Sequence, residues 1–321
     1  MKRPSFFNFQ TLVFALVAAA ISTIYLTQPV LPILAQEFGV TPSQASYTVS
    51  AVILGIALAN LPFGLLADRV PVKRLILVGG VVVAAAGFFG ATTSNLALLV
   101  GARFVQGLFI PALTTCLAAY LSANLPLEQL NVAMGSYVSA TVAGGLGGRL
   151  LGGWIHPPLH WRYALVTAAL LVLVAALAAL RWLPPGKLPG EGKKLQKGFL
   201  ALLAQPGLRR AFQVAFGGFF VFSSIFNYLP FYLHRPPFNA PTELITLLYL
   251  TYLVGVFIGP VAGRLSNRIG NGGTMVLGSL VLVLAIALTL IQSIFVIAAA
   301  LILVCAGFFS IHAAAMGSLN R

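Results

Sequence analysis

Long apolar stretches of roughly 20 residues recur along this chain and are separated by short polar or charged connections. An apolar helix of about 20 residues is as long as the hydrocarbon core of a bilayer is thick. Helices satisfy their own backbone hydrogen bonds in lipid, so the pattern predicts transmembrane helices. Ten are expected, at about 10–34, 44–67, 75–93, 96–122, 130–153, 161–183, 209–233, 243–263, 274–292 and 294–317.

The composition agrees with this pattern. The chain is 59% hydrophobic and only 7% charged, with a mean hydropathy of +0.98, whereas a soluble domain carries about 25% charged residues. The predicted class is therefore an all-α polytopic membrane protein. The first apolar run continues to Leu34, past any Ala-rich cleavage site, which predicts an uncleaved first helix. Cys116 and Cys305 lie inside apolar runs without metal or disulfide spacing, so no metal and no cofactor are expected.

The net charge of +14 does not indicate a nucleic-acid partner, because the bases lie in the connections and form no single basic face. The excess of bases on one side of a membrane predicts a cytoplasmic N-terminus. Of the 19 bases, Arg162 and Arg235 then lie outside, and Arg103 and Arg149 lie within helices. The others lie inside: Lys2, Arg3, Arg69, Lys73, Arg74, Arg181, Lys187, Lys193, Lys194, Lys197, Arg209, Arg210, Arg264, Arg268 and Arg321.

A Pro-, Gly- and Lys-rich stretch marks a domain boundary. It predicts an N-terminal six-helix half at 1–183, a basic cytoplasmic linker at 184–208 and a C-terminal half at 209–321. An internal repeat supports this division, because each copy follows the second helix of its half: Gly64-Leu65-Leu66-Ala67-Asp68-Arg69 and Gly263-Arg264-Leu265-Ser266-Asn267-Arg268. Parallel repeats of this kind are typical of transporters with a pathway between two halves.

The first copy of the repeat places an acid beside bases at the end of an apolar helix. A charge near hydrocarbon is costly unless it is paired or faces water. Two interpretations stay open, an inner gate and a solvated turn that sets topology. The candidate gate residues are Gly64, Asp68, Arg69, Lys73, Arg74 and, from the second copy, Arg268.

Charged and small residues inside the helices are further candidates. Arg103 and Gln106 are three residues apart and share a helix face, which predicts a polar network in the pathway or a site for an anionic group. The alternative, for Arg103 and for Arg149, is a side chain that extends to the lipid headgroups. A glycine-rich helix predicts either close packing or a bendable helix between the halves, with Gly144, Gly145, Gly147, Gly148, Gly152 and Gly153.

Polar residues in the first and seventh helices are candidates to line a substrate cavity: Tyr25, Gln28, Asn227 and Tyr228, with His312 from the tenth. His312 could instead make an interhelical hydrogen bond. No carboxylate lies in the middle of a predicted helix, so a coupling proton would need His312, an acid at a helix end, or a group in further helices. No acid–base pair, metal cluster or nucleophile constellation indicates an enzyme.

These motifs resemble the major facilitator superfamily. The turn at 64–74 resembles its G-x-L-a-D-R-x-G-r-[RK] motif, with Pro71 at or beside the second glycine. Arg103-Phe104-Val105-Gln106-Gly107 resembles its R-F-x-Q-G motif. The proton-driven efflux branch has a similar glycine motif, here without its proline. Three further stretches look like a bacterial inner-membrane efflux subgroup: Tyr25 to Pro32, Gly148-Arg149-Leu150 and His160-Trp161-Arg162-Tyr163.

The resemblance implies a monomeric carrier in the lipid bilayer of the bacterial inner membrane. It would export a small neutral or amphipathic molecule, such as a drug or a sugar, by alternating access and proton antiport. Members of the family have twelve helices, and the acid of the first motif braces against the eleventh. Ten predicted helices therefore suggest a truncated chain. The alternative function is a non-transporting carrier fragment that acts as an assembly or sensing partner.

Overall fold

The computed structural model describes residues 6–186 and 205–319, and its regular structure there is helical. The chain divides into two compact units, residues 1–193 (unit 1) and 194–321 (unit 2). In the described residues seven helices are long and apolar enough to cross a membrane, in agreement with the polytopic class. The predicted linker at 184–208 lies largely outside the described residues, and the count of ten helices stays a prediction.

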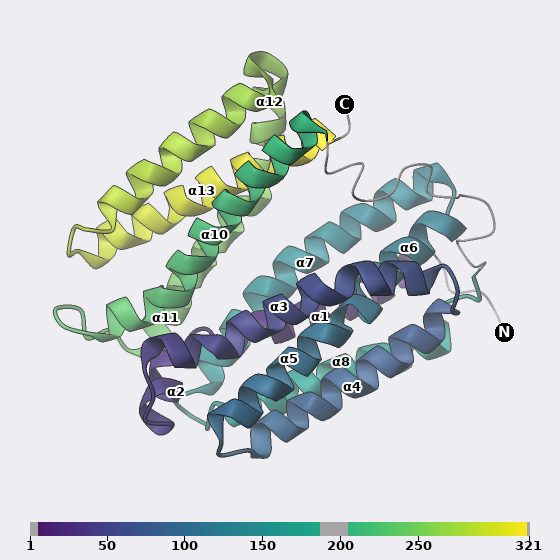
Figure 1. The fold of residues 1–321 in the computed structure, drawn as a ribbon, viewed down its shortest axis with the longest axis horizontal. Helices are drawn as coiled ribbons and strands as arrows, with labels where there is room; N and C mark the ends of the chain where they lie inside the picture. The colour runs from purple at the N-terminus through teal and green to yellow at the C-terminus, as the bar shows by residue number, and fades with distance from the viewer. Residues whose placement is uncertain (1–5, 187–204, 320–321) are drawn as a thin grey trace. The chain divides into compact units, whose positions relative to one another are not determined.

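Unit 1 is a helical bundle, coloured purple to teal in Figure 1. Its helices begin where the sequence places N-caps. Thr41 makes a capping box with Gln44, and Asn95 accepts the backbone N–H of Leu98, as Ser, Thr, Asp and Asn do at helix starts. The elements are α1 (Phe6–Tyr25), α2 (Leu31–Glu37), α3 (Pro42–Ala67), α4 (Val72–Thr92), α5 (Leu96–Leu113), α6 (Thr115–Asn124), α7 (Leu127–Ile155) and α8 (Arg162–Trp182).

Two helices that the sequence predicts as continuous are broken. The expected helix at 10–34 ends at Tyr25 and resumes at Leu31 as α2, because Pro29 has no N–H to continue the hydrogen-bond ladder. The expected helix at 96–122 is interrupted at Thr114, three residues after Pro111. Both predictions of an unbroken helix are wrong, and the first break positions the candidate site.

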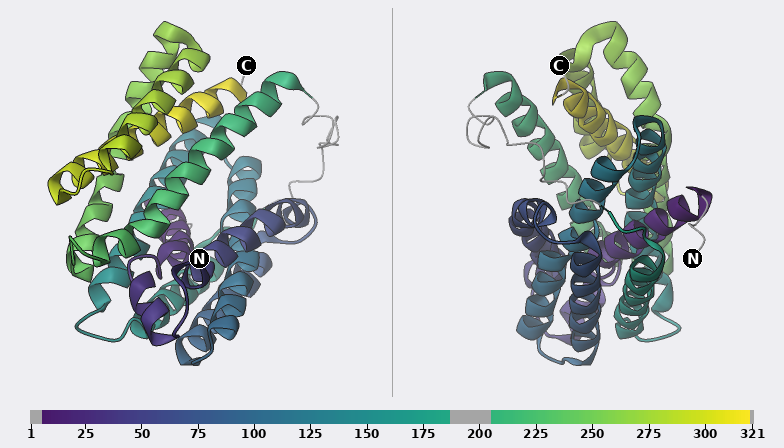
Figure 2. Two further views of the ribbon diagram at one scale, coloured as in Figure 1. Left: turned by 60° about the vertical axis from the view of Figure 1, so that its left-hand side comes forward. Right: turned by 90° about the vertical axis from the view of Figure 1, so that its right-hand side faces the viewer.

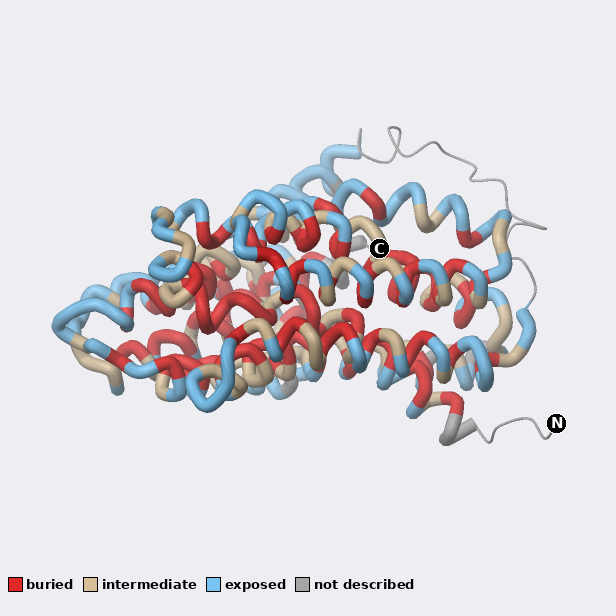
Figure 3. The backbone as a smooth tube through the Cα atoms, turned by 90° about the horizontal axis from the view of Figure 1, so that it is seen from below, coloured by how far each residue is buried: buried red, intermediate tan, exposed pale blue. Residues whose placement is uncertain are grey.

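The core of unit 1 forms around α1, which packs against α7 and α8, while α5 packs against α3 and α4. Val13, Leu16 and Val17 on α1 are fully or almost fully buried. Buried and exposed positions alternate along the helices in Figure 3, so each helix has an inward and an outward face. Outward positions include apolar residues such as Leu54 and Leu58 on α3, as expected for helices that face lipid.

Unit 2 has its core between α10, α13 and a 3₁₀ turn. Phe222 stacks on Phe308 with ring centroids 4.1 Å apart, and Phe226 stacks on Tyr249 at 5.7 Å. The Tyr249 hydroxyl donates to the carbonyl of Phe226 (3.2 Å). The elements are α10 (Pro206–His234), α11 (Thr242–Leu248), η1 (Tyr249–Leu253), α12 (Val254–Leu288) and α13 (Ile294–Leu319).

The sequence predicts a turn at 264–273, and the chain does reverse within this range, but the reversal is confined to Gly270. The segment is helical on both sides of Gly270, whose backbone has φ 78° and ψ 162°, a conformation that glycine adopts without strain. Both views of Figure 2 show the chain turning back within α12. The Thr274 hydroxyl donates to the carbonyl of Gly270 (3.0 Å) and lies 3.1 Å from the Ser266 hydroxyl. The expected eighth and ninth helices are therefore α11, η1 and two arms of α12.

Candidate functional site

Arg103 on α5 is completely buried in unit 1. Its guanidinium donates from Nε to Thr48 O (2.9 Å), from Nη1 to Gln106 Oε1 (2.7 Å) and from Nη2 to Ile24 O (2.7 Å). Gln106 in turn donates from Nε2 to Val83 O (3.1 Å). The predicted contact between Arg103 and Gln106 is present, and it joins α1, α3, α4 and α5. Extension of Arg103 to the headgroups is therefore excluded.

The break in α1 explains how unit 1 accommodates this buried charge. In a continuous helix, Ile24 O would accept the N–H of Gln28, but that N–H bonds to Tyr25 O (3.0 Å). The carbonyls at a helix C-terminus lack intrahelical partners and carry a partial negative charge. Arg103 takes up one of them, so the end of α1 supplies both an acceptor and a compensating dipole.

Arg149 on α7 is 1% exposed and lies against the same break. Its Nε donates to Gln28 Oε1 (2.7 Å) and its Nη1 to Gly145 O (2.8 Å). The guanidinium carbon lies 3.9 Å from the centroid of the Tyr25 ring, in a cation–π contact. Tyr25 and Gln28, predicted to line a cavity, therefore lie together with Arg149. Extension of Arg149 to the headgroups is excluded as well.

One further contact connects the two arginines. Thr27, next to Gln28 in the chain, lies with its hydroxyl 3.1 Å from that of Thr48, and the carbonyl of Thr48 accepts from Arg103. A buried series of polar contacts thus crosses unit 1 from α7 to α4. We call it the polar belt, and it consists of Tyr25, Thr27, Gln28, Thr48, Arg103, Gln106 and Arg149.

The polar belt lies at one depth in the bundle. Thr48 is six residues from the start of α3, Arg103 seven from the start of α5, and Arg149 six from the end of α7. At 1.5 Å per residue, these positions are about 9–10 Å from the same end of the bundle. The break between α1 and α2 therefore lies inside the apolar part of unit 1, where polar groups need partners.

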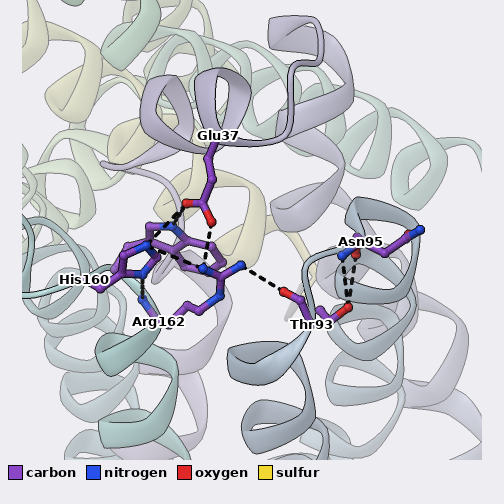
Figure 4. Close-up of polar contacts among 6 residues, drawn as sticks. Glu37, Thr93, Asn95, His160 and Arg162 are labelled. Atoms are coloured by element: carbon purple, nitrogen blue, oxygen red, sulfur yellow. Dashed lines mark hydrogen bonds and ion pairs between the residues drawn. The ribbon is translucent and has the colours of Figure 1, made fainter.

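A second polar cluster, which we call the clasp, closes that end of unit 1 (Figure 4). Its residues are Glu37, Thr93, His160, Trp161 and Arg162. Arg162 Nη1 lies 2.7 Å from Glu37 Oε1, and Arg162 Nη2 donates to Thr93 O (3.0 Å). Trp161 is 1% exposed, and its Nε1 donates to Glu37 Oε2 (2.5 Å).

The clasp ties the end of α2 to the α4–α5 turn and to the start of α8. Sequence reasoning did not identify it. The available signal was an acid and a base in two connections on the same predicted side of the membrane. That signal does not show which connections are neighbours in space.

Only some of the predicted glycines of α7 lie in close contact with a neighbouring helix. Gly144, Gly148 and Gly152 are four residues apart on α7. A Cβ on the first two would meet backbone atoms of α1, at Ala18 and Ser22, and a Cβ on Gly152 would meet the backbone of Leu26, directly after α1. The two helices therefore run parallel, backbone against backbone, as small residues allow. Gly147 has open space around it and Gly145 has ordinary contacts. The seam lies within unit 1.

The candidate gate residues lie at the opposite end of unit 1. Asp68 is the C-cap residue of α3, and the side chains of Asp68, Arg69 and Arg74 are exposed. Lys73 Nζ donates to Leu180 O near the end of α8 (3.1 Å), which suits a cation at a helix C-terminus. Gly64 is part of α3 and partly buried, and Arg268 is exposed on α12. Their role as a gate stays a prediction.

The cavity candidates of unit 2 are not gathered into one site. Asn227 is 8% exposed, whereas its neighbour Tyr228 is 46% exposed. His312 is exposed on α13, and its ring stacks against Phe308 with centroids 5.8 Å apart. In the described residues the polar belt of unit 1 is thus the better assembled candidate.

Residues 12–320 match the family model described as Major Facilitator Superfamily. The chain belongs to this superfamily. Among curated proteins, it is 26% identical to a transporter of Buchnera aphidicola subsp. Schizaphis graminum, over 92% of this chain and 73% of that protein. The MFS-type transporter YybF of Bacillus subtilis is 27% identical over 98% and 79%. The inner membrane transport protein YnfM of Escherichia coli is 28% identical over 85% and 66%.

Solved structures of this facilitator fold agree. A bacterial homologue of the human lysosomal transporter Spinster, inward-facing and unoccupied, matches with a TM-score of 0.84 at 15% identity, over 99% of this chain and 76% of that one. The nucleoside transporter NupG (D323A mutant) matches with a TM-score of 0.75 at 12% identity, over 97% and 86%. Its membership of the Major Facilitator Superfamily makes the chain a multi-pass membrane transporter and not an enzyme.

Proposed function

We propose that this facilitator is a secondary active transporter that exports a small neutral or amphipathic molecule by alternating access, with protons as the counter-transported ion. The observation that carries the proposal is the polar belt across the break in α1. Discontinuous helices with nearby ionisable groups are typical of substrate and ion sites in secondary transporters. Family membership and the transporter relatives support the same function.

The polar belt offers chemistry that suits such a substrate. Tyr25 presents an aromatic face, Gln28 an amide and Arg149 a guanidinium, all at the break. The clasp joins three connections at its end of unit 1, which favours movement of that bundle as a rigid body during the rocking step. From the distribution of bases, we place the clasp outside and the gate motif on the cytoplasmic side of a bacterial inner membrane. We expect the carrier to act as a monomer.

Proton coupling requires an ionisable group that binds and releases a proton. In the described residues the acids stand at helix ends, with Glu37 ending α2, Asp68 capping α3, and Glu128 and Glu243 in the first turns of α7 and α11. A proton would bind to one of these acids or to His312. In the proposal Asp68 and Arg69 form the cytoplasmic gate.

Transport into proteoliposomes tests the proposal. The purified 321-residue chain is compared with YybF and with empty liposomes, under an imposed pH gradient, using panels of labelled sugars and lipophilic dyes. We expect accumulation of at least one solute that stops when a protonophore collapses the gradient. Accumulation that continues unchanged after the protonophore is added would refute proton antiport. Transport by YybF without any transport by this chain would favour the alternative of a non-transporting carrier fragment.

A further inference from the structure

We propose that the Arg149–Gln28 pair is an anion-recognition site, and that the transported molecule carries a carboxylate that replaces the Gln28 amide oxygen on the Arg149 guanidinium. The inference rests on the proposed function and narrows its substrate class to amphipathic organic acids. It is carried by the chemistry of the pair, by the charge balance of the polar belt and by the position of Gln28 in the chain.

The chemistry of the pair favours exchange. A guanidinium presents its N–H groups in a planar fork that matches the two oxygens of a carboxylate. Gln28 offers Arg149 a single neutral oxygen, at 2.7 Å from Nε. A carboxylate in the same place adds the attraction of opposite charges and a second acceptor. The amide oxygen of Gln28 thus occupies the position that a substrate oxygen would take.

The charge balance of the polar belt favours an anion. The belt holds two guanidinium groups, Arg103 and Arg149, both at most 1% exposed. Arg103 is compensated by a carbonyl at the end of α1. The acids of the described residues stand at helix ends, and Glu37, at the end of α2, is already paired with Arg162 in the clasp. A buried positive charge disfavours a cation nearby and favours an anion.

The position of Gln28 allows the exchange. It lies in the five-residue break between α1 and α2 and is held there by turn hydrogen bonds, including Val30 N to Thr27 O at 3.2 Å and Leu31 N to Gln28 O at 3.5 Å. No regular helix has to unwind for the Gln28 side chain to turn away from Arg149. Gln28 and Arg149 are themselves buried, and Tyr25, which covers the Arg149 guanidinium, is partly exposed. A ligand would therefore reach the pair past Tyr25.

Binding is tested by thermal unfolding of the purified full chain with three probes of similar size: phenylacetate, phenylacetamide and phenethylamine. We expect phenylacetate to raise the unfolding temperature most and phenethylamine least. R149Q should lose the response to phenylacetate, and R149K should keep part of it, because it retains the charge without the fork. G147A, on the same helix and in open space, is the control that should respond as the wild type does.

Q28E provides a second, independent variant if R149Q does not fold. The new carboxylate should occupy the guanidinium, raise the unfolding temperature without ligand and abolish the response to phenylacetate. A wild-type protein stabilised equally by phenethylamine, or a Q28E protein with an undiminished phenylacetate response, would overturn the inference.

Uptake of the same probes into proteoliposomes, corrected with empty liposomes, separates this inference from the proposed function. We expect the wild type to carry phenylacetate about tenfold faster than the amide, and R149Q to carry both at similar rates. Transport of the amide alone would leave the carrier function intact and overturn the anion site. Arg149-dependent binding of phenylacetate with no uptake of any probe would support the site and refute the carrier function instead.

Discussion

The parallel contact between α1 and α7 makes the strongest prediction for stability. A Cβ added at Gly148 would meet the carbonyl oxygen, carbonyl carbon and Cα of Ser22. All three are backbone atoms in the last turn of α1, so no side-chain rotation relieves the clash. Gly148→Ala therefore requires α1 to move away from α7 along the whole seam.

The magnitude follows from the two effects that an alanine has here. Overpacking in a close-packed interior costs about 1–3 kcal/mol. Replacing a helical glycine by alanine gains up to about 1 kcal/mol in helix propensity. Gly147→Ala receives the same gain without the clash, because nothing lies within 4 Å of its Cβ. The two neighbouring variants should thus differ in unfolding free energy by about 1–3 kcal/mol, with Gly148→Ala the less stable.

Unfolding of the purified variants in mixed detergent micelles, followed by tryptophan fluorescence, measures this difference. Movement of α1 should also weaken the contact between Arg149 and Gln28, so transport should fall in Gly148→Ala and not in Gly147→Ala. Equal stability of the two variants would show that α1 and α7 do not approach as closely as the backbone contacts indicate, and would refute the reasoning.

Three further substitutions test other parts of the bundle. Arg103→Met leaves the acceptors on α1 and α5 without a donor, which should lower the free energy of unfolding by about 1–3 kcal/mol for each acceptor. Unfolding measurements that show no loss of stability would contradict a structural role for the network. Phe222→Ala, in the aromatic core of unit 2, should lower the free energy of unfolding by about 3–5 kcal/mol. Phe216→Ala, at a position that is 72% exposed, should be close to neutral. Equal losses in the two variants would contradict the packing. Glu37→Gln should lower the free energy of unfolding by about 1 kcal/mol. In a double-mutant cycle, this loss should disappear when Arg162→Met has already removed the partner. Additive losses would mean that Glu37 and Arg162 contribute no pairwise energy.

Local rules were enough for the fold class and for part of the site. The length of the apolar runs predicted membrane helices, and the family match agrees with the motifs at 64–74 and 103–107. The pairing of Arg103 with Gln106 followed from their spacing, because residues three apart on a helix share a face. The motif of Gly64 and Asp68 was likewise found from local sequence, although its role as a gate stays a prediction.

The helix breaks were harder to predict. Prolines occur within membrane helices and often only bend them, so Pro29 and Pro32 did not reveal where the first helix stops. Gly270 was placed inside a longer turn, because the sequence does not show that one residue with positive φ can reverse the chain. Which glycines of α7 touch α1 was equally open, since Gly147 and Gly148 look the same in the sequence and only one of them faces the neighbouring backbone.

The sequence alone thus determined a helical membrane protein, because apolar length and helical periodicity act over a few residues. Its motifs, by their resemblance, indicated the facilitator family. Only the tertiary structure decided that Gln28 meets Arg149, 121 residues away, and that Glu37 meets Trp161, 124 residues away. Such contacts depend on which helix faces meet and at what depth. These are set by the packing of small residues across several helices at once, and no local pattern in the chain carries that information.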